Sequence, residues 1–136
     1  MPSEPNTVIA NHSGFWDSVF MMGRHWPMFL AKAEVQKYPV YGQFAKALKS
    51  IFVDRQGSKS SKQAIAEAII TRQQDRDLGK YDFPLCIYPE GMSGNNRCLL
   101  PFRKGAFLNC SSVKPYVFRY KGPWFNPTCE SIDLFS

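Results

Sequence analysis

The sequence lacks the long apolar segments by which membrane-spanning and secreted proteins are recognised. A spanning helix needs about 18 or more consecutive apolar residues, and no stretch of this 136-residue chain approaches that length. The N-terminal segment MPSEPNT has no apolar core of the kind that a signal peptide contains. We therefore expect any contact of this chain with a membrane to be peripheral.

Cysteine and histidine are too few and too dispersed for the usual metal and redox sites. The chain has 4 cysteines without a CxxC pair, and its 2 histidines do not cluster with them. The cysteines are Cys86, Cys98, Cys110 and Cys129. We expect four free thiols in a reducing compartment, and no bound metal.

Nucleic-acid recognition also has little support. With 17 Lys and Arg against 11 Asp and Glu, the net charge is +6. Such an excess would suit an anionic membrane surface, a phosphate-bearing ligand or a nucleic acid. Because no RNA-binding motif, zinc-finger spacing or basic helix accompanies the charge, we expect no nucleic-acid partner.

The sequence does contain enough apolar material for a folded core. Its 44% hydrophobic and 15% aromatic residues argue against disorder, and the length suits a single domain spanning residues 1–136. Short β-rich runs at 8–10, 28–31, 51–53, 85–88 and 113–120 alternate with helical patterns at 15–22, 35–48 and 60–74, the last opened by a capping box of Ser60 and Gln63. This alternation predicts an α/β fold with a partly parallel central sheet flanked by helices. Pro115 indicates an edge position for the last strand.

The stretch VIANHSGFWD, from Val8 to Asp17, is the centre of the functional prediction. A short buried strand stops at turn-forming residues, so His12 lies on a loop and Asp17 falls in or near the first helical turn. Across that loop the Asp17 carboxylate can accept a hydrogen bond from the His12 ring. Such a pair fixes the imidazole tautomer and raises its basicity, as a general base acting on a hydroxyl requires.

An ordinary structural explanation exists for the same two residues. A carboxylate in a first helical turn is favoured by the helix dipole alone, and a polar residue after a strand is common. On the HxxxxD pattern alone, that explanation would be preferred.

Three further positions carry charge or backbone freedom close to predicted strand ends. Arg55 follows a strand, where ligands gather in open α/β sheets, and its planar fork suits phosphate. The loop from Pro89 to Arg97 is rich in glycine and asparagine, so its backbone can approach a ligand, and Glu90 and Arg97 are its charges. For Arg55 the alternative is a surface ion pair, and for the loop of Glu90 it is an ordinary turn that faces solvent. Lys104, next to Arg103, precedes a predicted helix start in a fair arrangement for phosphate.

Taken together, four blocks in order carry a family resemblance: NHSGFWD, IFVDR, YPEGMSGN and VKPYVFRY. The chain resembles the glycerolipid acyltransferase superfamily, of the 1-acylglycerol-3-phosphate acyltransferase type, over nearly its whole length. The run NNRCLLPFRKGAF, followed by VKPYVFRY, looks most like the branch of lysophosphatidylcholine and lysophosphatidylethanolamine acyltransferases. The resemblance implies transfer of a fatty acyl group from acyl-CoA, a co-substrate and not a cofactor, to the free hydroxyl of a lysophospholipid.

The resemblance also implies roles for individual residues. His12 would be the catalytic base and Asp17 its orienting partner, while Arg55, Glu90 and Gly91 would help to place the acceptor's phosphate-bearing headgroup. Pro115, in the fourth block, would lie on the acyl-donor side. A membrane-associated protein on the cytosolic face, of the endoplasmic reticulum in a eukaryote, is implied as well.

The chain departs from its relatives in the third block and at its ends. Many relatives have EGTRS where this chain has EGMSG, so an arginine often assigned to the acceptor phosphate is missing. Arg97, Arg103 or Lys104 would substitute for it. The phosphatidylcholine-related branch also tends to lack that arginine, so the resemblance favours an acceptor other than lysophosphatidic acid. We expect the chain to be a fragment without the family's N-terminal membrane anchor and C-terminal elements. A non-catalytic lipid-binding or membrane-surface module with the same fold is the alternative function.

Overall fold

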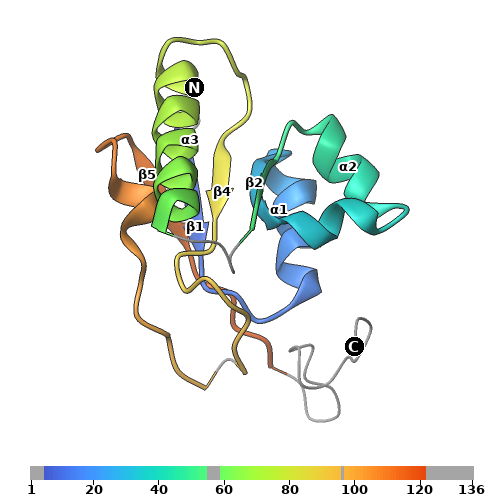
Figure 1. The fold of residues 1–136 in the computed structure, drawn as a ribbon. Helices are drawn as coiled ribbons and strands as arrows, with labels where there is room; N and C mark the ends of the chain where they lie inside the picture. Colours follow the sequence, from blue (N-terminus) through green and yellow to red (C-terminus); the bar gives the residue numbers. More distant parts are fainter. Residues whose placement is uncertain (1–4, 55–58, 96, 122–136) are drawn as a thin grey trace.

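A five-stranded sheet organises the computed structural model, which describes residues 5–54, 59–95 and 97–121 (Figure 1). The strands are β1 (Thr7–Ala10), β2 (Met28–Lys32), β3 (Ile51–Val53), β4 (Leu85–Ile87) and β5 (Val113–Tyr116). Their order in the sheet is β3-β2-β4-β1-β5, and every pair of neighbours runs parallel. The predicted α/β class is confirmed, and among the described strands the sheet is wholly parallel.

Helices cover both faces of this sheet. The α-helices are α1 (Phe15–His25), α2 (Tyr41–Ala47) and α3 (Lys59–Asp77), and two short 3-10 helices are η1 (Ala33–Lys37) and η2 (Lys104–Phe107). In Figure 1, α3 stands on one side of the strands, with α1 and α2 on the other. The molecule is therefore a three-layer sandwich of helix, sheet and helix.

Alternation along the strands divides the core into two layers. Ile9, Leu85 and Ile87 point toward α3, where they pack with Ile69. Their strand neighbours Val8 and Cys86 point the other way and pack with Met21 of α1, as does Phe29. Successive side chains of a strand leave the sheet on opposite faces, so strands with no polar alternation are buried on both sides.

Three predicted boundaries are wrong. Instead of one helix over 35–48 there are two pieces, η1 and α2, because the chain turns at Pro39 and Gly42 packs on backbone. A Cβ at Gly42 would lie 2.7 Å from the Val35 carbonyl oxygen. Ser60 lies inside α3, so it does not cap it. The last strand ends at Tyr116 rather than at 120, although it does occupy an edge.

Because all strands run parallel, the carboxyl ends of the strands all lie at the same end of the sheet. Cys86, Cys98 and Cys110 are free thiols as predicted, while Cys129 lies outside the described residues. None of the helices within the described ranges is both long and apolar enough to cross a membrane.

A buried glutamine joins α3 to the sheet. The side-chain amide of Gln73 is completely buried and donates to Thr7 Oγ1 at 2.9 Å and to the Ala106 carbonyl at 3.0 Å. Gln73→Ala removes both donors and should lower the free energy of unfolding by about 1–3 kcal/mol in urea denaturation. Gln74→Ala is the control, since that exposed side chain makes one 3.4 Å contact. Equal midpoints for both variants would contradict this account.

Candidate active site

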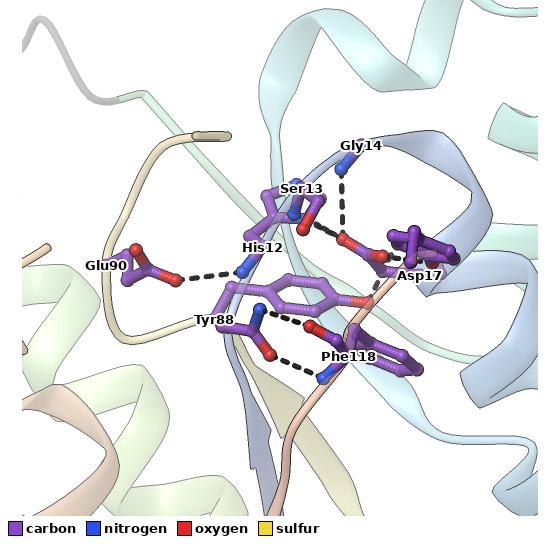
Figure 2. A network of polar contacts seen from close by, with 10 residues as sticks. His12, Ser13, Gly14, Asp17, Tyr88, Glu90 and Phe118 are labelled. Carbon is purple, nitrogen blue, oxygen red and sulfur yellow. Dashed lines mark hydrogen bonds and ion pairs between the residues drawn. The ribbon is translucent and has the colours of Figure 1, made fainter. Parts of the chain in front are cut away.

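The predicted contact between His12 and Asp17 is present. His12 leaves the end of β1, and Asp17 lies in the first turn of α1, where its carboxylate turns back toward the loop (Figure 2). The distance between His12 Nδ1 and Asp17 Oδ2 is 3.1 Å. Their local geometry therefore agrees with the sequence-based expectation, and the histidine ring remains partly accessible at 22% exposure while the carboxylate is fully buried.

Asp17 is held by four donors. Its Oδ2 atom accepts hydrogen bonds from the His12 ring and from the backbone amides of Ser13 and Gly14, the latter at 2.9 Å, and its Oδ1 atom accepts the Tyr120 hydroxyl. Burial alone would raise the pKa of Asp17, but these donors, His12 and Tyr120 foremost, outweigh it and leave the pKa below the usual value. Asp17 is therefore an anion at neutral pH, and it also caps the N-terminus of α1.

The ionised carboxylate fixes which ring nitrogen of His12 carries the proton. A carboxylate can only accept, so the neutral imidazole must donate from Nδ1. The lone pair is then on Nε2, the nitrogen that faces away from Asp17. This is the tautomer that a histidine needs to remove a proton from a substrate.

Tyr88, the first residue after β4, stacks against the His12 ring. The His12 and Tyr88 rings are stacked with centroids 4.1 Å apart and planes 14° apart (Figure 2). The Tyr88 hydroxyl lies 3.2 Å from Ser18 Oγ on α1. Burial raises the pKa of Tyr88 well above its ordinary value, so this neighbour of the imidazole stays uncharged. The ring of His12 is thus fixed both in its plane and by its hydrogen bond.

Glu90 braces the loops on either side of the histidine. One carboxylate oxygen accepts the His12 backbone amide and the other accepts the Leu100 amide, each at 2.9 Å. The Gly94 amide in turn donates to the His12 carbonyl at 2.8 Å. The buried Glu90 side chain therefore ties the β4 loop to the β1 loop through backbone groups. Its predicted role at the acceptor headgroup stays a prediction.

Three clefts adjoin one another near the carboxyl ends of the strands. The first, about 190 Å3, is lined by His12, Ser18, Lys32, Tyr41 and Tyr88, among others. A second, about 480 Å3, shares Lys32 and Met92 with the first and is also lined by Arg103 and by two acidic residues, Glu34 and Asp54. The third, about 280 Å3, lies between α3 and the sheet and is mostly apolar, with Arg103, Lys104 and Lys62 as its cations. The cleft of His12 therefore adjoins both of the clefts that contain Arg103, since it shares lining residues with each of them.

Some of the other predicted site residues lie at these clefts and others do not. Gly91, with φ of 76°, lies under Arg103: a Cβ there would meet the Arg103 Nε at 2.8 Å, so only glycine allows this approach. Lys104 lines the apolar cleft, whereas the three clefts do not include Arg97 or Pro115. Both of these residues are exposed, and Pro115, on the edge strand β5, is in register with Ile9 of β1. Arg55 lies outside the described residues. Binding roles for all of these stay predictions.

Sequence reasoning missed three residues that contact the central pair or its loop. Tyr88 ends a predicted strand, and nothing in its position there indicates a contact with His12. Asn11 and Tyr120 gave no signal because their partners lie 107 and 103 residues away. Within the described part of the chain no group of histidine, cysteine, aspartate and glutamate has a metal-binding arrangement.

Comparison with known proteins identifies relatives of the whole segment. Residues 1–118 match the family model described as Acyltransferase. The chain is 28% identical over 131 residues to lysophospholipid acyltransferase LPEAT1 of Arabidopsis thaliana, covering 96% of this chain and 33% of that protein. It is 32% identical over 117 residues to lysophospholipid acyltransferase LPCAT4 of Xenopus tropicalis, covering 85% and 22%. For human lysophosphatidylcholine acyltransferase 1 the identity is 29% over 121 residues, covering 88% and 22%. The chain thus spans a third or less of each of these relatives, and no solved structure matches it.

The lowered pKa of Asp17 predicts a specific dependence of stability on pH. Since the folded-state pKa is below the unfolded value, Asp17 contributes stability above the unfolded pKa and loses it as the pH falls through the folded pKa. Asp17→Asn should lower the free energy of unfolding near neutral pH by about 1–3 kcal/mol, because an amide places a donor against donors. As the pH is lowered, its free energy of unfolding should also decrease less steeply than that of the unaltered protein, as measured by denaturation at several pH values.

The matched control for this variant is Asp75→Asn, which removes the same charge from a surface pair with Lys80. Exposed pairs contribute little. Identical pH profiles for the two variants would show that Asp17 is not specially stabilised.

Proposed function

The chain belongs to the glycerolipid acyltransferase superfamily, in the branch of the lysophosphatidylcholine and lysophosphatidylethanolamine acyltransferases, and from this we propose that it transfers a fatty acyl group from acyl-CoA to the free hydroxyl of a lysophospholipid. The single observation that carries the proposal is the His12–Asp17 pair, with Nδ1 held by a buried anion. That arrangement leaves a basic nitrogen beside an open cleft.

In the proposed reaction His12 acts as a general base. Nε2 takes the proton of the acceptor hydroxyl while its oxygen attacks the thioester carbonyl, and Asp17 stabilises the imidazolium that forms. Collapse of the tetrahedral intermediate breaks the carbon–sulfur bond, and the departing CoA thiolate recovers the proton from the ring. No serine nucleophile is needed: the Ser13 hydroxyl is buried, without a hydrogen-bond partner among the described residues.

We assign the phosphate of the acceptor to the cleft that contains Lys32 and Arg103. This cleft adjoins that of His12, and the Arg103 side chain lies against Gly91, two residues before Ser93, which stands where many relatives have an arginine. An arginine fork binds phosphate well. The apolar cleft beyond Arg103 then suits a fatty acyl chain, with Lys104 at its border. The proposed partners are therefore acyl-CoA, a lysophospholipid and the membrane surface that supplies it.

The general-base role has a direct kinetic test. His12→Ala should reduce lysophospholipid-dependent release of CoA from acyl-CoA by about 100- to 10,000-fold, because removal of a positioned base costs that much. Ser13→Ala is the matched control and should retain activity, since its hydroxyl has no partner to lose. Undiminished turnover in His12→Ala would refute the mechanism, and liposome binding without any turnover would favour the non-catalytic lipid-binding module.

The proposed phosphate-binding role of Arg103 can be distinguished from that of Arg97 by measuring the KM for the lysophospholipid. Arg103→Gln should raise KM for the lysophospholipid by about tenfold or more, with a smaller effect on kcat, because a charged hydrogen bond to phosphate is lost. Arg97→Gln tests the competing candidate, and Arg24→Gln on the exposed end of α1 controls for net charge. A larger KM effect in Arg97→Gln than in Arg103→Gln would transfer the assignment to Arg97.

A further inference from the structure

The buried face of Asp17 that points away from His12 is occupied by a tyrosine from the end of the described chain. Three of the donors to Asp17 bind Oδ2 and come from residues 12–14, but Oδ1 accepts the hydroxyl of Tyr120. Among the described residues the Tyr120 hydroxyl donates to Oδ1, and the Asp17 side chain has no exposure to solvent. The orientation of the carboxylate plane thus depends on two segments that are far apart in the sequence.

Asn11 anchors the segment that brings Tyr120 to this position. Its side-chain amide donates to the Phe118 carbonyl at 2.9 Å and accepts the Phe118 amide at 2.7 Å (Figure 2). Asn11 is buried and immediately precedes His12. The last pair of β1 and β5 is Ala10 with Tyr116, and this double contact joins the next residue of one segment to Phe118 of the other through a side chain. Tyr120 thus reaches Asp17 from a fixed position.

We propose that Tyr120 is a positioning residue for the reaction: its hydroxyl holds the Asp17 carboxylate in the plane that keeps Nδ1–H of His12 bonded and Nε2 directed at the substrate. The inference rests on the proposed function, which it deepens by assigning a role to the segment after β5. Asn11 fixes the position of this segment relative to His12 through its two hydrogen bonds with Phe118.

The chemistry of the phenol fits such a role. Burial, followed by the hydrogen bond to Asp17 and the charge of that carboxylate, raises the pKa of Tyr120, so it remains a donor throughout the neutral range. A donor on Oδ1 draws charge away from Oδ2 and therefore moderates how strongly Asp17 holds a proton on the imidazole. Loss of the phenol should leave a more basic carboxylate with freedom to rotate.

Other groups that face the pair are unaffected by the phenol. Tyr88 and Glu90 contact His12 through its ring and its backbone amide, Lys32 lines the same cleft, and Cys86 lies near Asp17 with a thiol whose pKa burial raises. Burial raises the pKa of both Tyr88 and Cys86, so these two groups stay neutral at working pH. A change in the pH profile after loss of the phenol would thus originate at Asp17.

The test compares Tyr120→Phe with Tyr116→Phe in the full chain. Both variants lose one hydroxyl from the same segment, but Tyr116 contacts His25 Nε2, at the far end of α1. Tyr120→Phe should lower kcat by about 10- to 100-fold, the equivalent of one charged hydrogen bond, with KM for both substrates unchanged. Its acid limb in the pH profile of kcat should move to higher pH, whereas Tyr116→Phe should leave that limb in place.

A double variant and a stability measurement complete the test. Adding Tyr120→Phe to Asp17→Asn should cost no further activity, because the phenol acts through the carboxylate. Acid denaturation reads the same contact without turnover: in Tyr120→Phe the folded-state pKa of Asp17 moves toward its unfolded value, so stability should fall less steeply as the pH is lowered.

The outcomes separate this inference from the proposed function. His12-dependent turnover that is unchanged in Tyr120→Phe, or reduced without any movement of the acid limb, overturns the positioning role and leaves the acyltransferase proposal standing. Turnover that is undetectable in the unaltered chain overturns the proposed function and the positioning role with it. A lower kcat with a shifted acid limb and a shallower acid denaturation profile supports both.

Discussion

A single buried carboxylate constrains the whole site. Asp17 lies in the first turn of α1 with no exposure to solvent, and a charge in such a place is stable only if donors surround it. The donors come from the loop of His12, from the backbone that opens the helix, and from a tyrosine beyond the last strand. The position of the imidazole, the start of α1 and the path of the chain after β5 therefore depend on one another.

The parallel sheet explains how distant segments meet at that carboxylate. β1 lies between β4 and β5, so the loops that leave the three strands are neighbours although they are far apart in sequence. The β1 loop contributes His12, the β4 loop contributes Tyr88 and Glu90, and the segment after β5 contributes Tyr120. Glu90 and Asn11 then join these loops through backbone amides and carbonyls, which places rigid support around the ring.

Local relationships in this protein could be predicted from the sequence, and long-range ones could not. The contact of His12 with Asp17 spans five residues and follows from a strand, a turn and a helix start. The helix boundary errors at 35–48 arose because apolar spacing continued across Pro39. Tyr120 was assigned to a strand, since alternation over 113–120 resembled one, and no pattern linked it to a carboxylate 103 residues earlier. Ordered motif blocks compensated for this by fixing the family, but they do not specify side-chain partners.

The central claim is that Asp17 holds His12 with the proton on Nδ1 and the lone pair on Nε2. Nitrogen-15 NMR of the imidazole ring at a pH where it is neutral tests this most directly. A protonated Nδ1 and an unprotonated Nε2 are the expected result, and Asp17→Asn should weaken that preference. A ring that carries its proton on Nε2, or that exchanges freely between both tautomers in the unaltered protein, would contradict the account.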